Sequence, residues 1–449
     1  MIPLYPVDRP RPIEPYQVFI LSSLVLAIAG GFAFGLLISL SRAGDWGWDA
    51  RSSELVQSHG QLQILGFAGL YVMGMGLRLL PRFSGLHLRF QSLLFPMWGL
   101  TVAGLIVRAF VQPWLSDDLH VAVMVGTQIA LLAAGVCFFL IVAGTLLTRD
   151  NHSDATGLFF FLGAALFLAQ ALAGAYATIQ GAADDARLLS YLPDTAIVYL
   201  QLAGFVLAFI GGVSGRAIPT MVGQTRAIRT GKAAALVQAS AVLTLAAALL
   251  WIEYVDYSLT AVRLADVALI ALGPAFLLIA LLPGVFRPAS RLRPASRPHF
   301  WLVRTAFAWL AFAGLLASYF GAKALAHDTL PGLFEVDAIR HSLGIGLITT
   351  LIVGMSLLIV PEFAGQRMNQ PDQALVSFVL LGLLNGAAAL RVATALAGMH
   401  WTAETRGWLM AASGVLAETA MIVFALSFLE LFVSGRLPPP DLAPRAPVP

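Results

Sequence analysis

Two of the eight histidines are notable because each opens a long apolar segment. His59 precedes Pro81 by 22 residues and His341 precedes Pro361 by 20, which in a helix is about 33 and 30 Å. We therefore expect the two imidazoles at similar depths on two different helices. Imidazole is a common protein ligand of haem iron, so such a pair could hold one planar metal complex from both sides. A pair of capping histidines at a membrane interface fits the same spacing, and spacing alone slightly favours it.

Arginines within or beside the apolar segments could complete such a site. Haem propionates need cationic partners, and an arginine can bind a carboxylate through two hydrogen bonds. The candidates are Arg108, Arg340, Arg391 and Arg406. Snorkelling of the side chain to lipid headgroups is the alternative, equally supported for Arg108 and favoured for Arg406.

Two acidic residues also fall inside apolar segments, where ionisable groups are costly and often functional. Asp266 and Glu418 could relay protons. Pairing of Asp266 with Arg263, three residues away, is the alternative for the first of them.

The composition indicates which elements must position these residues. Of the 449 residues, 59% are apolar and only 11% are Asp, Glu, Lys or Arg, and the apolar residues come in long blocks. Soluble domains carry about twice that charge, so a soluble enzyme, a disordered chain and a nucleic-acid-binding protein are excluded. The single cysteine, Cys137, excludes a disulfide framework and a cysteine-based metal site.

Twelve blocks of about 20 residues are each long enough to cross a bilayer as a helix. We therefore predict an all-α polytopic membrane protein, because lipid leaves no backbone group unpaired and the blocks lack the alternation of a barrel. We expect an extended cytoplasmic segment at 1–15, a single transmembrane domain at 16–435 and a proline-rich tail at 436–449. Basic residues are commoner in loops on the side of the termini, which predicts that both termini are cytoplasmic.

Three apolar segments share one pattern, in which a glycine about two turns before the end is followed by a proline and, four residues later, by another glycine. The segments are His59–Gly85, Gln201–Gly223 and His341–Gly365, and their prolines are Pro81, Pro219 and Pro361. They are the second, sixth and tenth blocks, so a unit of four helices is used three times, at about 16–148, 156–285 and 300–433. Because the three segments run in one direction, we expect pseudo-symmetry about an axis along the membrane normal.

This plan, with histidines opening spans two and ten, resembles subunit I of the haem-copper oxidases, in which those spans supply the axial ligands of a low-spin haem. The closer local resemblance is to the NnrS family, haem- and copper-associated membrane proteins linked to nitric oxide metabolism in denitrifying bacteria. It rests on GFAG (66–69), Gly74 and PRFSG (81–85) in span two, and on HSLGIGLITTLIVGM (341–355) in span ten.

The sequence departs from both families. The second span of NnrS proteins begins with H-x-H, whereas the second position here is Gln61. Oxidases carry further histidines in spans six, seven and ten, whereas spans six and seven have none here. The resemblance therefore implies a low-spin haem without a copper-haem reaction centre, and oxygen reduction by this chain alone is not expected.

We accordingly expect a multi-pass haem b protein of the bacterial inner membrane, with His59 and His341 as axial ligands near the outer face. Copper is a further candidate, at a site that the sequence does not identify. The expected role is electron transfer with a redox protein or quinol, or a response to nitric oxide. A secondary transporter and a non-catalytic structural subunit on the same scaffold remain as alternatives, although the few charges near the midplane fit transporters poorly.

Overall fold

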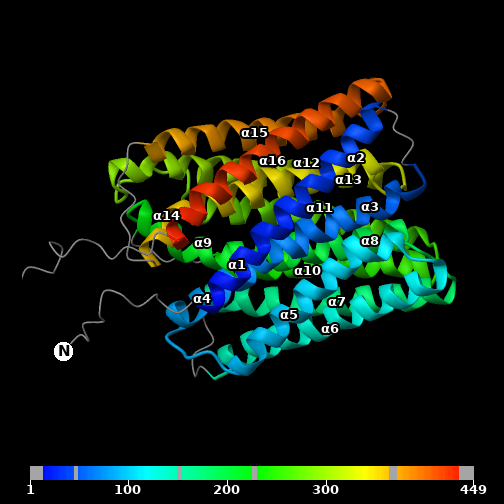
Figure 1. Ribbon diagram of the computed structural model, residues 1–449, viewed down its shortest axis with the longest axis horizontal. Coiled ribbons are helices and arrows are strands. Elements are labelled where there is room, and N and C mark those ends of the chain that lie inside the picture. Colours follow the sequence, from blue (N-terminus) through cyan, green and yellow to red (C-terminus); the bar gives the residue numbers. More distant parts are fainter. Residues whose placement is uncertain (1–13, 45–48, 149–153, 225–229, 364–371, 434–449) are drawn as a thin grey trace, which may run out of the picture.

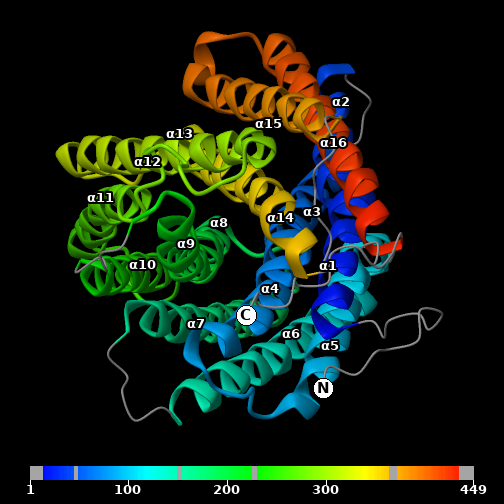
Figure 2. The ribbon, with the colours of Figure 1, turned by 90° about the vertical axis from the view of Figure 1, so that its left-hand side faces the viewer.

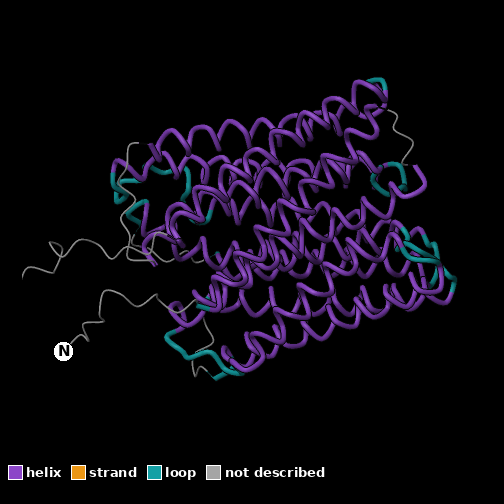
Figure 3. Tube along the Cα trace, in the orientation of Figure 1, coloured by secondary structure: helices purple, strands orange, loops and turns teal. Residues whose placement is uncertain are grey.

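All regular structure in the computed structural model is helical within the residues that it describes, which are 14–44, 49–148, 154–224, 230–363 and 372–433 (Figure 3). This part of the chain contains twelve helices long and apolar enough to cross a membrane. The predicted all-α polytopic membrane protein is thereby confirmed. The predicted N-terminal segment lies outside the described residues except for Glu14 and Pro15, and the predicted tail at 436–449 lies wholly outside them.

The helices follow one another through short connections (Figure 1). Spans one to four comprise α1 (Pro15–Leu26), η1 (Ala27–Phe32), α2 (Ala33–Gly44), α3 (Asp49–Gln61), η2 (Leu62–Gly69), α4 (Leu70–Ser84), η3 (Gln91–Leu93), α5 (Leu94–Ile106), η4 (Val107–Val111), η5 (Gln112–Trp114) and α6 (Asp117–Leu146). Spans five to eight comprise α7 (Ala155–Ala183), α8 (Tyr191–Tyr199), η6 (Leu200–Val206), α9 (Leu207–Met221), α10 (Gly231–Tyr254) and α11 (Leu259–Leu281). After η7 (Pro294–Ser296), spans nine to twelve comprise α12 (Arg297–Ala326), α13 (Leu333–His341), η8 (Ser342–Thr349), α14 (Thr350–Phe363), α15 (Asp372–Ala397), η9 (Gly398–His400) and α16 (Ala403–Val433).

Spans two, six and ten form the centre of the bundle. In their most apolar stretches 78%, 94% and 72% of the residues are buried, whereas the value for the other nine described spans is at most 56%. Viewed along the helices, α4 and α14 lie inside the ring formed by the outer spans (Figure 2). The three segments singled out by their glycine and proline pattern are thus the core, although the proposed unit boundaries stay a prediction.

Each central span contains one π-helical segment, and these segments occupy the same register. η2, η6 and η8 begin at Leu62, Leu200 and Ser342, in each case 19 residues before the proline of the pattern. The three segments contact one another at the centre. A π-helical turn holds one residue more than an α-helical turn and is often found at functional sites.

The glycine that follows each proline has a conformational role where it is described. Gly85 and Gly223 lie next to the ends of α4 and α9 and have φ of 72° and 73°, a left-handed conformation that glycine adopts without strain. The amide of Gly85 donates to the carbonyl of Pro81 at 2.9 Å, which satisfies a carbonyl of the last turn. The third glycine, Gly365, lies outside the described residues.

Candidate functional site

A cavity of about 690 Å³ opens between spans one, two, six, ten, eleven and twelve. It lies towards the end of the bundle that contains α3 and α13. Its volume falls within the range of roughly 300–1,000 Å³ that is usual for small-molecule and cofactor pockets. His59 and His341 both line this cavity, so the structure brings together the two histidines that the sequence singled out.

His59 is held by span one. Its Nδ1 lies 2.6 Å from the carbonyl oxygen of Gly31, which belongs to the π-helical segment η1. A Cβ added at Gly35, one turn further along span one, would lie 2.7 Å from Cε1 of the imidazole. Because a carbonyl oxygen only accepts hydrogen bonds, Nδ1 carries the hydrogen and the lone pair is on Nε2.

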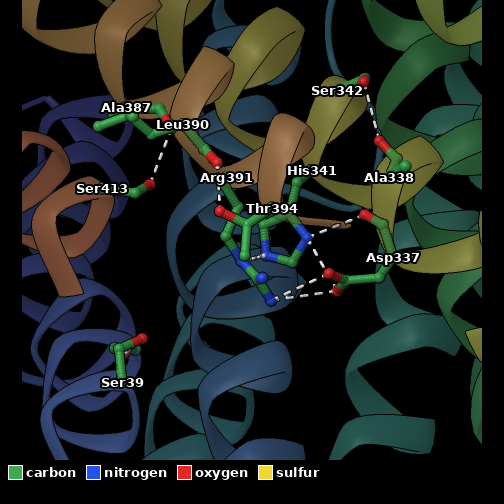
Figure 4. A network of polar contacts seen from close by, with 11 residues as sticks. Ser39, Asp337, Ala338, His341, Ser342, Ala387, Leu390, Arg391, Thr394 and Ser413 are labelled. Carbon is green, nitrogen blue, oxygen red and sulfur yellow. Dashed lines mark hydrogen bonds and ion pairs between the residues drawn. The ribbon is translucent and has the colours of Figure 1, made fainter. Parts of the chain in front are cut away.

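His341 is held on both sides by charged residues (Figure 4). Its Nδ1 lies 3.0 Å from the backbone oxygen of Asp337 and 3.0 Å from the carboxylate Oδ1 of the same residue. On the other side, Nε of Arg391 donates to His341 Nε2 at 3.2 Å. Arg391 also pairs with Asp337, its Nη2 lying 3.2 and 3.1 Å from the two carboxylate oxygens. His341 therefore also carries its hydrogen on Nδ1 and a lone pair on Nε2.

Three of the four predicted arginines lie in the cavity wall, together with Arg42. Arg391 is described above, and Arg340 donates from Nη2 to Thr195 at 2.8 Å, while its buried Nε has no hydrogen-bond partner among the described residues. Arg406 donates to the carbonyl of Gly398 at 2.6 Å. Asp194, 3.8 Å from Nη1 of Arg340, and Asp337 lie in the same wall, so its four arginines leave it with a net positive charge.

Arg108 is placed elsewhere, in span three, where it is buried and donates to Oε1 of Gln128 at 3.0 Å. Asp266 is fully buried in α11, and neither of its carboxylate oxygens has a hydrogen-bond partner within the described residues. Arg263 does not pair with it but with Asp328, at 2.8 Å. Glu418 lies one residue beyond the cavity-lining Ala417, and its Oε2 is likewise without a partner in the described part. Arg108, Asp266 and Glu418 are thus not part of the cavity wall as described.

Several neighbours of the histidines escape notice in the sequence. Asp337 could have been found, because it precedes His341 by four residues and so lies on the same helix face. The roles of Gly31, Gly35 and Arg42 depend on the packing of span one against span two, for which a single sequence carries no signal.

The wall combines imidazole nitrogens with cationic side chains, which are the groups that a planar metal complex with carboxylates would require. Both imidazoles carry a lone pair on Nε2, although that of His341 accepts from Arg391, and four arginines and two aspartates line the same wall. Gln61, also in the wall, has a buried Oε1 without a partner among the described residues. In the described part of the chain, no group of three or more His, Cys, Asp or Glu side chains could hold a metal ion, so no residue can be assigned to copper.

The comparison with protein families agrees with the resemblance noted in spans two and ten. The family model described as NnrS protein matches residues 13–436, which is nearly the whole chain. No curated protein matches the sequence. The chain is therefore a multi-pass membrane protein that belongs to the NnrS family.

Proposed function

We propose that the cavity holds haem b between His59 and His341. The observation that carries this proposal is that both imidazoles line one cavity, each with its Nδ1 bound by an acceptor. This arrangement leaves Nε2 of each ring as the nitrogen without a hydrogen, as outer partners do for metal-bound histidines. Neutral imidazole nitrogen is a usual ligand of haem iron, which supplies one-electron chemistry when bound.

The arginines of the wall have two tasks in this proposal. Arg340, Arg391 and Arg406 would neutralise the propionates, because all three line the cavity. Arg391 must also release Nε2 of His341, from which it is 3.2 Å away, before that nitrogen can bind iron. Because its Nη2 contacts Asp337, Arg391 can leave His341 and remain in the wall.

His59 and His341 would both be used to hold the iron, which favours electron transfer over binding of a gas. We propose that the protein passes electrons near the outer face of the bacterial inner membrane, with both termini cytoplasmic and a redox protein or quinol as partner. The link to nitric oxide metabolism comes from the NnrS family. In this proposal the protein would supply electrons to that metabolism or respond to nitric oxide. No copper-haem reaction centre is part of this proposal.

The test is a reduced-minus-oxidised absorption spectrum of the purified protein after haem-replete expression. We expect a Soret band and the α-band of a bis-histidine haem b, both lost in His59→Ala and in His341→Ala. The control is His327→Ala, which replaces an exposed histidine at the same end whose Nδ1 contacts the carbonyl of Lys323.

A wild-type protein without a Soret band would refute the proposal. If only His341→Ala loses the haem, a single histidine ligand replaces the bis-histidine site. Uptake of a substrate into liposomes by haem-free protein would favour a transporter instead.

A further inference from the structure

The two histidines of the cavity are held through the same ring nitrogen, but by acceptors of different charge. His59 Nδ1 contacts the neutral carbonyl of Gly31 at 2.6 Å. His341 Nδ1 contacts the carboxylate of Asp337 at 3.0 Å, in addition to the carbonyl of that residue. The two imidazoles therefore differ in their electronic surroundings although they line the same cavity.

We propose that Asp337 is a positioning residue that makes His341 the stronger electron donor of the two imidazoles. This inference rests on the haem site proposed above. A carboxylate that accepts the Nδ1 hydrogen fixes the orientation of the ring and raises the basicity of Nε2. A neutral carbonyl polarises the ring less, so His59 is the weaker donor.

Asp337 can act in this way because it lies one helical turn before His341. Residues four apart on a helix share a face, so the carboxylate reaches Nδ1 without distortion of α13. The Asp337 side chain is only 23% exposed, and its ion pair with Arg391 offsets the desolvation cost of the carboxylate. The pair is thus held in the wall whether or not Arg391 contacts His341.

The test compares the midpoint potential of the bound haem, at one fixed pH, in the wild type, Asp337→Asn and Asp194→Asn. Asp194 is the matched control because it lines the same cavity but pairs with Arg340, at 3.8 Å, and not with a histidine. Strong donation stabilises the ferric form. We therefore expect Asp337→Asn to shift the ferric-to-ferrous equilibrium at least tenfold towards ferrous, or about 59 mV for a one-electron couple. Asp194→Asn should shift it by less than half of that amount.

Electron paramagnetic resonance of the ferric protein gives a second measurement. The g values report the donor strength of the axial ligands, so they should change in Asp337→Asn and not in Asp194→Asn. Asp337→Glu keeps the charge, and its potential should lie nearer to that of the wild type. If Asp337→Asn binds no haem while Asp337→Glu does, the positioning role is supported as well.

Equal shifts of potential in Asp337→Asn and Asp194→Asn, with unchanged g values, would overturn the inference, because the loss of one negative charge would then explain both. In that case the haem site itself stands, since the wild type has bound its haem. A wild type without haem would overturn both the proposed function and this inference.

Discussion

Gly35 provides the space for the ring of His59, and its replacement by alanine tests the geometry of the cavity. The added Cβ would lie 2.7 Å from Cε1 and 3.1 Å from Nδ1 of the imidazole. Non-bonded carbon atoms rest about 3.5–4.0 Å apart, so the ring and span one must separate by at least about 0.8 Å. Metal–ligand distances vary by only about 0.2 Å, so this displacement is incompatible with an unchanged site.

We expect Gly35→Ala to lower the haem affinity about 10- to 100-fold, the loss usual when an outer partner of a metal ligand is removed. The assay is a titration of haem into the purified apoprotein, followed by absorbance at the Soret band. The control is Gly126→Ala, because Gly126 lies in α6, outside the cavity wall as described, and a Cβ there meets nothing within 4 Å. Its haem affinity should stay within about twofold of the wild type, since the added methyl group meets no neighbour and lies outside the cavity wall, and alanine is favoured over glycine in a helix.

An unchanged haem affinity in Gly35→Ala would refute the reasoning, because His59 cannot keep its place beside a methyl group at that distance. Thermal melting of the two apoproteins separates a local change from a loss of folding. A melting temperature of Gly35→Ala close to that of Gly126→Ala would show that the site alone has changed.

Two further comparisons test the wall and the core. Arg391→Leu leaves the carboxylate of Asp337 without this cation, so the haem content should fall. Arg108→Leu, outside the cavity wall, should leave the haem content per folded protein unchanged. Equal losses of haem in the two variants, measured by a pyridine haemochrome assay, would contradict this prediction. Phe209→Ala should destabilise the protein by about 3–5 kcal/mol, because the ring is 2% exposed and lies against Gly76 at the centre of the bundle. Denaturation in detergent measures the loss of stability, and the haem spectrum at low temperature should not change. A loss of stability below about 1 kcal/mol would show that the side chains at the centre of the bundle repack.

Much of the architecture could be predicted because apolar length and polar scarcity are properties of the sequence. The bilayer sets the length of a span, so the distance of His59 and of His341 from a proline predicts their depth, and both line one cavity. The glycine that follows α4 also fits its place in the sequence pattern, since a residue in the left-handed conformation at a helix end is usually glycine. These features depend on the local geometry of a helix, so the spacing of residues in the sequence is enough to predict them.

The contacts of the site could not be predicted, because they depend on which helix faces meet. Arg108 and Arg391 lie at comparable positions in spans three and eleven, yet only the second lines the cavity as described. The carbonyl that holds His59 comes from η1, a π-helical segment without a signature in the sequence. His120 lies close to a loop in the sequence, yet it is 1% exposed and its Nδ1 lies 2.9 Å from the backbone oxygen of Gln112.

The shared register of η2, η6 and η8 bears on how the protein arose. Each π-helical turn is one inserted residue, and three independent insertions at the same position are less economical than one insertion in an ancestral four-helix unit that was later copied twice. In the three segments the residue before the wide turn is Gln61, Tyr199 and His341. On the predicted duplication, the three units have diverged at an equivalent position, and only the third has a histidine there.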